Sequence, residues 1–197
     1  ALETLGPATI TLAAGSAAMS RWYGFGHSLS AIVTNKEPYF LARELPKMMD
    51  TSCDVDAKDY KFTKTTDIFQ EALYKAVIEG KSWKGFEKWQ CVLKENSLNT
   101  TSVKRKHDAP ILYIVSGKDE LINPAIQRKS YDQLCKQGYR MNYIECKGAK
   151  HTKGAVWSLS NQFAWVADRL AGKPIVDVCK RTEPICCPGS DANVCTP

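Results

Sequence analysis

The clearest structural signal in the chain is the segment Ile111-Leu112-Tyr113-Ile114-Val115-Ser116-Gly117-Lys118-Asp119. Its first five residues are apolar and rich in β-branched side chains, which is typical of a strand buried on both faces in a parallel sheet. The serine and glycine that follow indicate a loop. Asp119 therefore comes directly after a predicted strand.

The residues beyond this loop predict a helix and a second strand. Asn123 and Pro124 have the types of a helix N-cap and a first helical residue, and Gly138 is placed to end the helix after Gln137. Residues 141–145 alternate between apolar and polar side chains, as a strand does. Because the two strands are joined through a helix, we expect them to run parallel.

A loop and an amphipathic helix are predicted next. Residues 148–154 form a loop that contains His151, and Gly172 and Pro174 end the helix that follows it. The apolar side chains of this helix are spaced so that they form one stripe, which consists of Val156, Leu159, Phe163, Val166 and Leu170.

The predicted fold class is therefore α/β with a parallel sheet. In such sheets reactive groups gather at the carboxyl ends of the strands, so we expect Asp119 and His151 to be neighbours at one edge. A carboxylate that orients an imidazole is the acid and base pair of a catalytic triad. In α/β-hydrolases the acid precedes the histidine along the chain, as here. Glu120, next to Asp119, is an alternative acid.

Three regions are predicted along the chain. Residues 1–108 lack the alternation of strands and helices and are expected to form a mostly helical lid or cap, with one helix over residues 66–79. Residues 109–175 are expected to form the C-terminal part of an α/β core. Residues 176–197, which contain four of the cysteines, are expected to form an irregular tail.

Cysteine usage and one sequence motif predict a secreted protein. The chain has eight cysteines and none of them forms a C-x-x-C pair, so disulfides in an oxidising compartment are expected, without a metal or another cofactor. Asn99-Thr100-Thr101 is an N-glycosylation acceptor, which fits the same compartment. No apolar segment approaches the ~18 residues that a membrane span requires.

Charge and aromatic residues give weaker signals. The net charge of +6 is spread along the chain, and its densest cluster, residues 104–107, is expected to be a solvated loop rather than a contact with an anionic surface. No motif for nucleic-acid binding is present, so no such partner is expected. Trp83, Phe86 and Trp89 alternate with lysines. They either face a lipid surface or, as we favour, pack inward.

A set of ordered motifs carries a family resemblance. These are Gly117-Lys118-Asp119-Glu120-Leu121-Ile122, Tyr131-Asp132-Gln133-Leu134-Cys135-Lys136-Gln137-Gly138, Met141-Asn142-Tyr143, Gly148-Ala149-Lys150-His151, and Trp165-Val166-Ala167-Asp168-Arg169-Leu170-Ala171-Gly172-Lys173-Pro174, followed by Cys179. In this order they resemble the fungal secretory lipase family, the α/β-hydrolases that include lipases of the Candida antarctica A type. Residues 22–30 also resemble the start of that family's lid.

The resemblance implies a secreted lipase or esterase that hydrolyses carboxylic esters with a Ser-Asp-His triad. It assigns the acid to Asp119 and the base to His151, and it implies a disulfide between Cys135 and Cys179. The family's first strands, oxyanion loop and G-x-S-x-G elbow would lie before Ala1. We therefore expect a complementary N-terminal chain that carries the serine and the oxyanion hole as a partner, with Cys53 or Cys91 bonded to it.

Two alternatives stay open. Gly26-His27-Ser28-Leu29-Ser30 is close to a G-x-S-x-G elbow, but residues 17–25 make a poor buried strand before it. We therefore expect Ser28 to belong to the lid. The chain is alternatively a non-catalytic relative of the hydrolases, secreted as a toxin subunit, effector or binding module. A co-purifying chain that contains G-x-S-x-G would distinguish the two.

Overall fold

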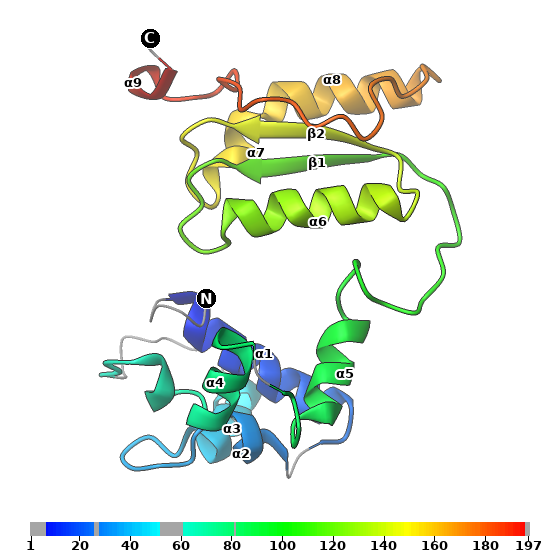
Figure 1. Cartoon of the computed structure of the whole chain (residues 1–197). Coiled ribbons are helices and arrows are strands. Elements are labelled where there is room, and N and C mark those ends of the chain that lie inside the picture. Colours follow the sequence, from blue (N-terminus) through cyan, green and yellow to red (C-terminus); the bar gives the residue numbers. More distant parts are fainter. Residues whose placement is uncertain (1–6, 26–27, 52–60, 81, 196–197) are drawn as a thin grey trace. The chain divides into compact units, whose positions relative to one another are not determined.

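The computed structural model describes residues 7–25, 28–51, 61–80 and 82–195 (Figure 1). The chain forms two compact units, residues 1–96 and residues 97–197. The sequence predicts three functional regions with bounds at residues 108 and 175. This division stays a prediction.

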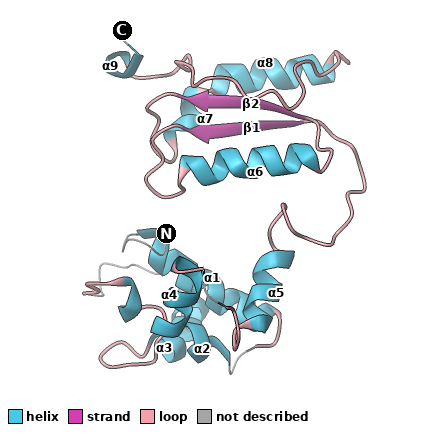
Figure 2. Ribbon diagram, in the orientation of Figure 1, coloured by secondary structure: helices cyan, strands magenta, loops and turns pink. Residues whose placement is uncertain are grey.

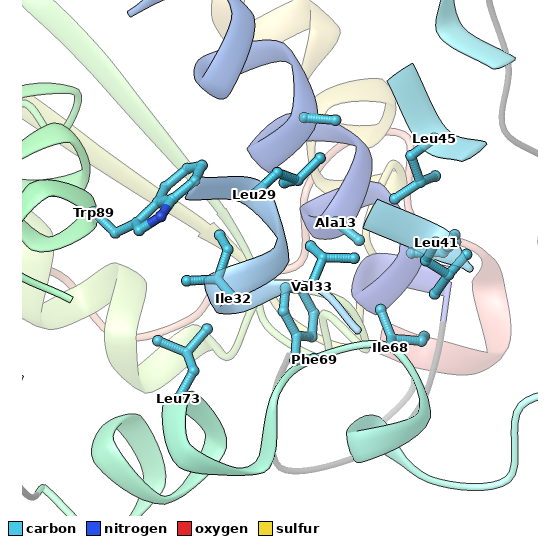
Figure 3. Packing of buried hydrophobic residues seen from close by; sticks show 12 residues of the cluster. Ala13, Leu29, Ile32, Val33, Leu41, Leu45, Ile68, Phe69, Leu73 and Trp89 are labelled. Carbon is cyan, nitrogen blue, oxygen red and sulfur yellow. The ribbon is translucent and has the colours of Figure 1, made fainter. Parts of the chain in front are cut away.

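The described part of the first unit is helical (Figure 2). Its elements are α1 (Pro7–Trp22), α2 (Leu29–Ile32), α3 (Leu41–Thr51), the 3-10 helix η3 (Thr65–Asp67), α4 (Glu71–Ile78) and α5 (Glu87–Glu95). Figure 3 shows how Leu29, Ile32 and Val33 pack among side chains of the other elements. These neighbours include Ala13, Leu41, Leu45, Ile68, Phe69, Leu73 and Trp89.

The aromatic segment before and within α5 belongs to this core. Trp89 is buried, and its indole N–H donates to the carbonyl oxygen of Ser28 at 3.3 Å. Trp83 and Phe86 are partly buried against the same cluster. The interpretation in which these aromatic side chains pack inward is confirmed, while contact of the protein with a lipid surface stays a prediction.

The helix expected over residues 66–79 is shorter than predicted. Phe69 forms an antiparallel bridge with Val33, and the N–H of Gln70 donates to the carbonyl oxygen of Ile32. These long-range bonds hold residues 68–70 out of the helix, so α4 begins at Glu71. Gly80 has a φ of 62°, which is the left-handed conformation expected of a residue that ends a helix.

The second unit contains a parallel two-stranded sheet. Its described elements are β1 (Ile111–Ser116), α6 (Pro124–Lys136), β2 (Met141–Cys146), α7 (Lys153–Trp157), α8 (Leu159–Leu170) and α9 (Ala192–Cys195). Ile111 pairs with Met141 and Ser116 with Cys146. Both predicted strands and their parallel pairing are confirmed.

Helices lie along both faces of this sheet (Figure 1). Because side chains alternate along a strand, Val115 and Tyr143 face α6, where they pack with Tyr131. Asn142 faces α8, where its side chain accepts the indole N–H of Trp165 at 2.8 Å. The predicted start of α6 is confirmed, because the side chain of Asn123 accepts the N–H of Ala125.

The final amphipathic helix differs from the prediction in two ways. It is divided at Ser158, so that α7 and α8 are separate. The hydroxyl of Ser158 donates to the carbonyl oxygen of Gly154 at 2.7 Å. The apolar stripe, which an amphipathic helix usually turns towards a core, is 46–85% exposed. The described strands are too few to cover it, since α8 contacts them through other residues such as Trp165.

The tail lies along the outer edge of β2. Ile185 accepts from the N–H of Lys147 and donates to Glu145, both at 2.8 Å. The disulfides Cys135–Cys179 and Cys146–Cys187 fasten this segment, and the first of them confirms the bridge that the family resemblance implies. Cys186 is disulfide-bonded as well.

The two cysteines of the first unit, Cys53 and Cys91, have a different status. Cys91 is a free, exposed thiol. Cys53 lies outside the described residues. A bond from either of them to a partner chain stays a prediction.

The amide of Asn99 makes specific contacts with α6. Its Nδ2 donates to Ser130 at 2.7 Å and to Gln133 at 3.2 Å. A glycan on Nδ2 would replace one of its two hydrogens and so remove at least one of these bonds. The folded geometry therefore weighs against the predicted N-glycosylation, which stays a prediction.

None of the described helices combines the length and the apolar composition of a membrane span.

We expect the double variant Cys135→Ser, Cys179→Ser to lower the free energy of unfolding by about 2–4 kcal/mol, because the lost bridge no longer restricts the unfolded chain. The two cysteines are 44 residues apart. Denaturant unfolding without reductant measures the effect. Cys91→Ser is the matched control and should leave the curve unchanged, since Cys91 is free. A double variant as stable as the parent protein would contradict the prediction.

Candidate active site

The site is built on the loops that leave the carboxyl ends of β1 and β2. The N–H of Gly117 donates to the carbonyl oxygen of Cys146 at 3.0 Å, and the N–H of Lys118 donates to Ala149 at 2.8 Å. A Cβ on Gly117 would lie 2.9 Å from the carbonyl oxygen of Cys146, so the close approach of the two loops requires glycine there. The two loops are therefore held as one structure.

Asp119 and His151 meet where these loops converge. Nδ1 of His151 lies 3.0 Å from Oδ1 and 3.1 Å from Oδ2 of Asp119. The side chain of Asp119 is only 4% exposed, whereas that of His151 is 36% exposed. Among the described residues, nothing forms a hydrogen bond with Nε2 of His151. The expected contact between the two side chains is confirmed, and their catalytic roles stay predictions.

The carboxylate of Asp119 is held in its ionised form. Burial alone would raise its pKa, but the N–H groups of Ile122 and Leu121 donate to Oδ1 at 2.8 and 2.9 Å, and His151 adds a further bond. Together these bonds hold the pKa of Asp119 below its ordinary value. An ionised acceptor at Nδ1 favours the tautomer in which Nδ1 carries the proton, and Nε2 is then available as a base.

Gln127 orients the same carboxylate from α6. Its Nε2 donates to Oδ2 of Asp119 at 3.2 Å and to the carbonyl oxygen of Ile122 at 3.0 Å. Each oxygen of Asp119 thus has a donor besides the imidazole. The sequence analysis missed this residue, because a glutamine in the first turns of a helix gives no signal of its own.

Glu120, the alternative acid, contacts the backbone instead of the ring. Its Oε2 accepts the N–H of His151 at 3.1 Å. The geometry therefore favours Asp119 as the partner of the imidazole. Glu120 supports the loop that carries the imidazole.

Ser116 anchors the other side of the histidine loop. Its hydroxyl donates to the carbonyl oxygen of His151 at 3.0 Å and accepts the N–H of Gly154 at 3.1 Å. A Cβ on Gly154 would lie 2.4 Å from that hydroxyl, so the contact requires glycine. The sequence contained one sign of this role, which is the position of a serine at the end of an apolar strand.

A second buried carboxylate lies beneath the loops. Glu145 is 2% exposed and is bound by Arg128 of α6, with Nε 2.9 Å from Oε2 and Nη2 2.5 Å from Oε1. Tyr143 donates its hydroxyl to Oε2 at 2.6 Å. The bonds from Arg128 hold the pKa of Glu145 below its ordinary value, and burial next to this carboxylate raises the pKa of Tyr143. The pair fixes α6 against β2, next to Gln127.

Ser28, the alternative nucleophile, lies in the first unit. Its hydroxyl donates to the carbonyl oxygen of Phe25 at 2.9 Å. The described residues before it form helix α1 and a turn rather than the buried strand that a nucleophile elbow requires. Gly26 and His27 lie outside the described residues.

No group of three or more His, Cys, Asp or Glu side chains that could hold a metal ion is found in the described part of the chain. What the arrangement offers chemically is a buried anion that orients an accessible imidazole.

Comparison with known proteins identifies one family. The family model described as Secretory lipase matches residues 8–178, which include most of each unit and the two residues of the site. No curated protein and no solved structure gives a significant match.

We expect Asp119→Asn to be less stable than the parent protein at about pH 6 and the difference to vanish as the pH falls below about 4, the ordinary pKa range of aspartate. The pKa of Asp119 is lower in the folded protein than in the unfolded chain. Its carboxylate therefore stabilises the fold at a pH above the pKa of the unfolded chain. This stabilisation is lost as the pH falls through the lower pKa of the folded protein. Denaturant unfolding across this pH range measures the effect. Asp108→Asn, at an exposed surface ion pair, is the control and should change stability little. A difference that persists unchanged in acid would contradict the prediction.

Proposed function

The chain belongs to the secretory lipase family, and from this membership we propose that it is the lid and the acid- and base-bearing part of a secreted lipase or esterase of the Candida antarctica A type. It hydrolyses carboxylic esters through a Ser-Asp-His triad in which Asp119 is the acid and His151 the base. The serine and the oxyanion hole are supplied by a complementary N-terminal segment. The observation that carries the proposal is the buried carboxylate of Asp119 at Nδ1 of His151.

The proposed reaction proceeds through an acyl-enzyme. The serine hydroxyl loses its proton to Nε2 of His151 while its oxygen bonds to the ester carbonyl carbon. The proton then passes to the leaving oxygen, the carbon–oxygen bond breaks and the alcohol departs. Water repeats the sequence on the acyl-serine and releases the carboxylic acid. Asp119 stays ionised throughout and stabilises the imidazolium form of His151.

The incomplete sheet of the second unit is evidence for the proposed complementary segment. Within the described residues β1 has a strand neighbour on one edge only. Ile111 and Gly117 donate towards β2, so by alternation the N–H groups of Leu112 and Ile114 point to the free edge. A free apolar edge and a two-stranded sheet are both unfavourable in isolation. We infer that further strands complete an α/β-hydrolase sheet here.

The exposed stripe of α8 supports the same inference. Phe163 is 71% exposed and Leu170 is 85% exposed, and both belong to the apolar stripe that the sequence predicts. Burying one such side chain contributes about 1.5–3 kcal/mol. In this proposal residues 1–108 form the lid, residues 109–175 the C-terminal part of the core, and residues 176–197 a tail fastened by disulfides.

We expect His151→Ala to reduce turnover of a short-chain ester by the assembled enzyme at least about 10³-fold, because the serine loses its general base. His107→Ala is the matched control, since His107 is exposed and lies in the segment before β1. It should leave turnover unchanged. Circular dichroism checks that both variants fold. Full activity of the His151 variant would exclude the proposed triad.

We expect a fluorophosphonate probe to label the natural protein on a serine within G-x-S-x-G that lies outside residues 1–197. The probe reacts with an activated serine hydroxyl, and peptide mapping locates the bond. Residues 1–197 expressed alone should take up no label. Label on Ser28 would replace the proposed nucleophile. A natural protein without any labelled serine would instead be the non-catalytic relative.

A further inference from the structure

Helix α6 is bonded both to the loop that carries the candidate acid and to the strand that precedes the candidate base. Its residues Gln127 and Arg128 are consecutive, so they point in directions about 100° apart. Gln127 donates to Oδ2 of Asp119, beyond the end of β1. Arg128 donates to both carboxylate oxygens of Glu145, near the end of β2. The ends of the two strands are therefore connected through α6 as well as through their pairing in the sheet.

The orientation of the Asp119 carboxylate depends on Gln127. The terminal torsion of an aspartate side chain is broad, so hydrogen bonds must fix it. The N–H groups of Leu121 and Ile122 both donate to Oδ1. Nδ1 of His151 lies almost equally far from the two oxygens, at 3.0 and 3.1 Å. Besides the imidazole, Gln127 is the one donor to Oδ2 among the described residues, and it therefore fixes the second oxygen.

Gln127 is itself held in place. Its Nε2 carries two hydrogens, and it donates to the carbonyl oxygen of Ile122 at 3.0 Å as well as to Asp119. Its backbone carbonyl oxygen accepts the hydroxyl of Tyr113, a residue of β1, at 3.2 Å. The amide group cannot turn away from the carboxylate without breaking both of its bonds.

The buried ion pair between Arg128 and Glu145 fixes α6 on the strand that leads to the base. A pair with two parallel bonds defines direction as well as distance, and the hydroxyl of Tyr143 holds the same carboxylate. Cys146, the next residue, ends β2, and the loop with His151 follows it. Since a buried ion pair adds little net stability over apolar side chains of similar size, its main effect here is the fixed position of α6.

We propose that Gln127 is a positioning residue for the pair of Asp119 and His151, and that the ion pair between Arg128 and Glu145 sets the place of Gln127. Gln127 acts through the acid. It keeps the carboxylate of Asp119 turned towards Nδ1 of His151, so that the proton of the neutral ring stays on that nitrogen and Nε2 stays free of it. This positioning belongs to the resting protein. Its consequence for the hydrolysis of esters rests on the proposed function.

The first test reads the position of the proton on His151. Nitrogen-15 NMR spectra of the imidazole rings distinguish the two neutral forms at about pH 9, well above the ordinary titration range of histidine. The purified protein is used, with any segment that co-purifies. The chain has three histidines, and the variant His151→Ala identifies the signals of His151. We expect Nδ1 to carry the proton in the parent protein.

Two variants of α6 test the role of Gln127. Gln127→Met keeps the length and the helix propensity of the side chain but removes its donor, so we expect a mixture of both neutral forms of His151. Gln133→Met is the matched control, because it changes the same residue type on the same helix, where Gln133 contacts Asn99 instead. Its spectrum should equal that of the parent protein. Circular dichroism checks that both variants fold.

A triple variant tests the ion pair without leaving a buried charge. Arg128→Met, Tyr143→Phe, Glu145→Leu replaces the whole polar group by apolar side chains, which should retain most of the stability in denaturant unfolding. We expect it to show the same mixture of neutral forms as Gln127→Met. The Gln127 variant keeps the ion pair intact, so it decides the role of Gln127 even where the triple variant does not fold.

Steady-state kinetics of the assembled enzyme test the catalytic consequence. We expect Gln127→Met to lower kcat for a short-chain ester roughly 10–100-fold, because a misplaced acid and base pair raises the barrier of the chemical step. KM should stay unchanged, since the pair does not bind the substrate in the ground state. The control Gln133→Met should leave both constants unchanged.

Three spectra would overturn the proposal. A parent-like spectrum of Gln127→Met would remove the role of Gln127. Equal changes in Gln127→Met and Gln133→Met would show only a general loosening of α6. A parent-like spectrum of the folded triple variant would remove the role of the ion pair. If Gln127→Met mixes the neutral forms of His151 while kcat stays at the parent value, the positioning stands and the proposed triad fails. The two failures are therefore separate results.

Discussion

The parallel pairing of β1 with β2 is the constraint on which the site depends. Pairing Ser116 with Cys146 ends the two strands at the same level, so that both following loops leave from one edge. The bond from Gly117 to Cys146 then continues the pairing one residue beyond the sheet. A shift of this register would separate Asp119 from His151, because both side chains are positioned through the backbone of these loops.

The two buried carboxylates of the second unit, Asp119 and Glu145, have different roles. Asp119 is surrounded by donors but leaves the imidazole half-exposed, which is useful for proton transfer. Glu145 is bound on both oxygens by Arg128 and Tyr143. Burying such an ion pair contributes little net stability, so its geometric effect is the more informative one. It fixes the turn of α6 that presents Gln127 to Asp119.

Residue types and their spacing predicted those parts of the second unit whose structure depends mainly on interactions between neighbours in the sequence. The strand segments, the cap at Asn123 and the order of Asp119 and His151 are visible in residue type and spacing. Residues 68–70 were misassigned because a bond between distant backbones, from Gln70 to Ile32, outweighed helix periodicity. Gln127 and Ser116 could not be found, since their importance arises only from what the folded chain places beside them. The disulfide Cys135–Cys179 was expected from the family resemblance alone.

The exposed stripe of α8 and the free edge of β1 bear on the same question, namely how the sheet is completed. The stripe, from Leu159 to Leu170, belongs to a helix that lies along one face of the sheet (Figure 1). An exposed apolar stripe is suited to permanent burial against protein. Within the described residues β1 has a strand neighbour on one edge only, and a free strand edge is likewise unfavourable in isolation. In the proposed enzyme, one complementary segment with further strands would therefore cover both.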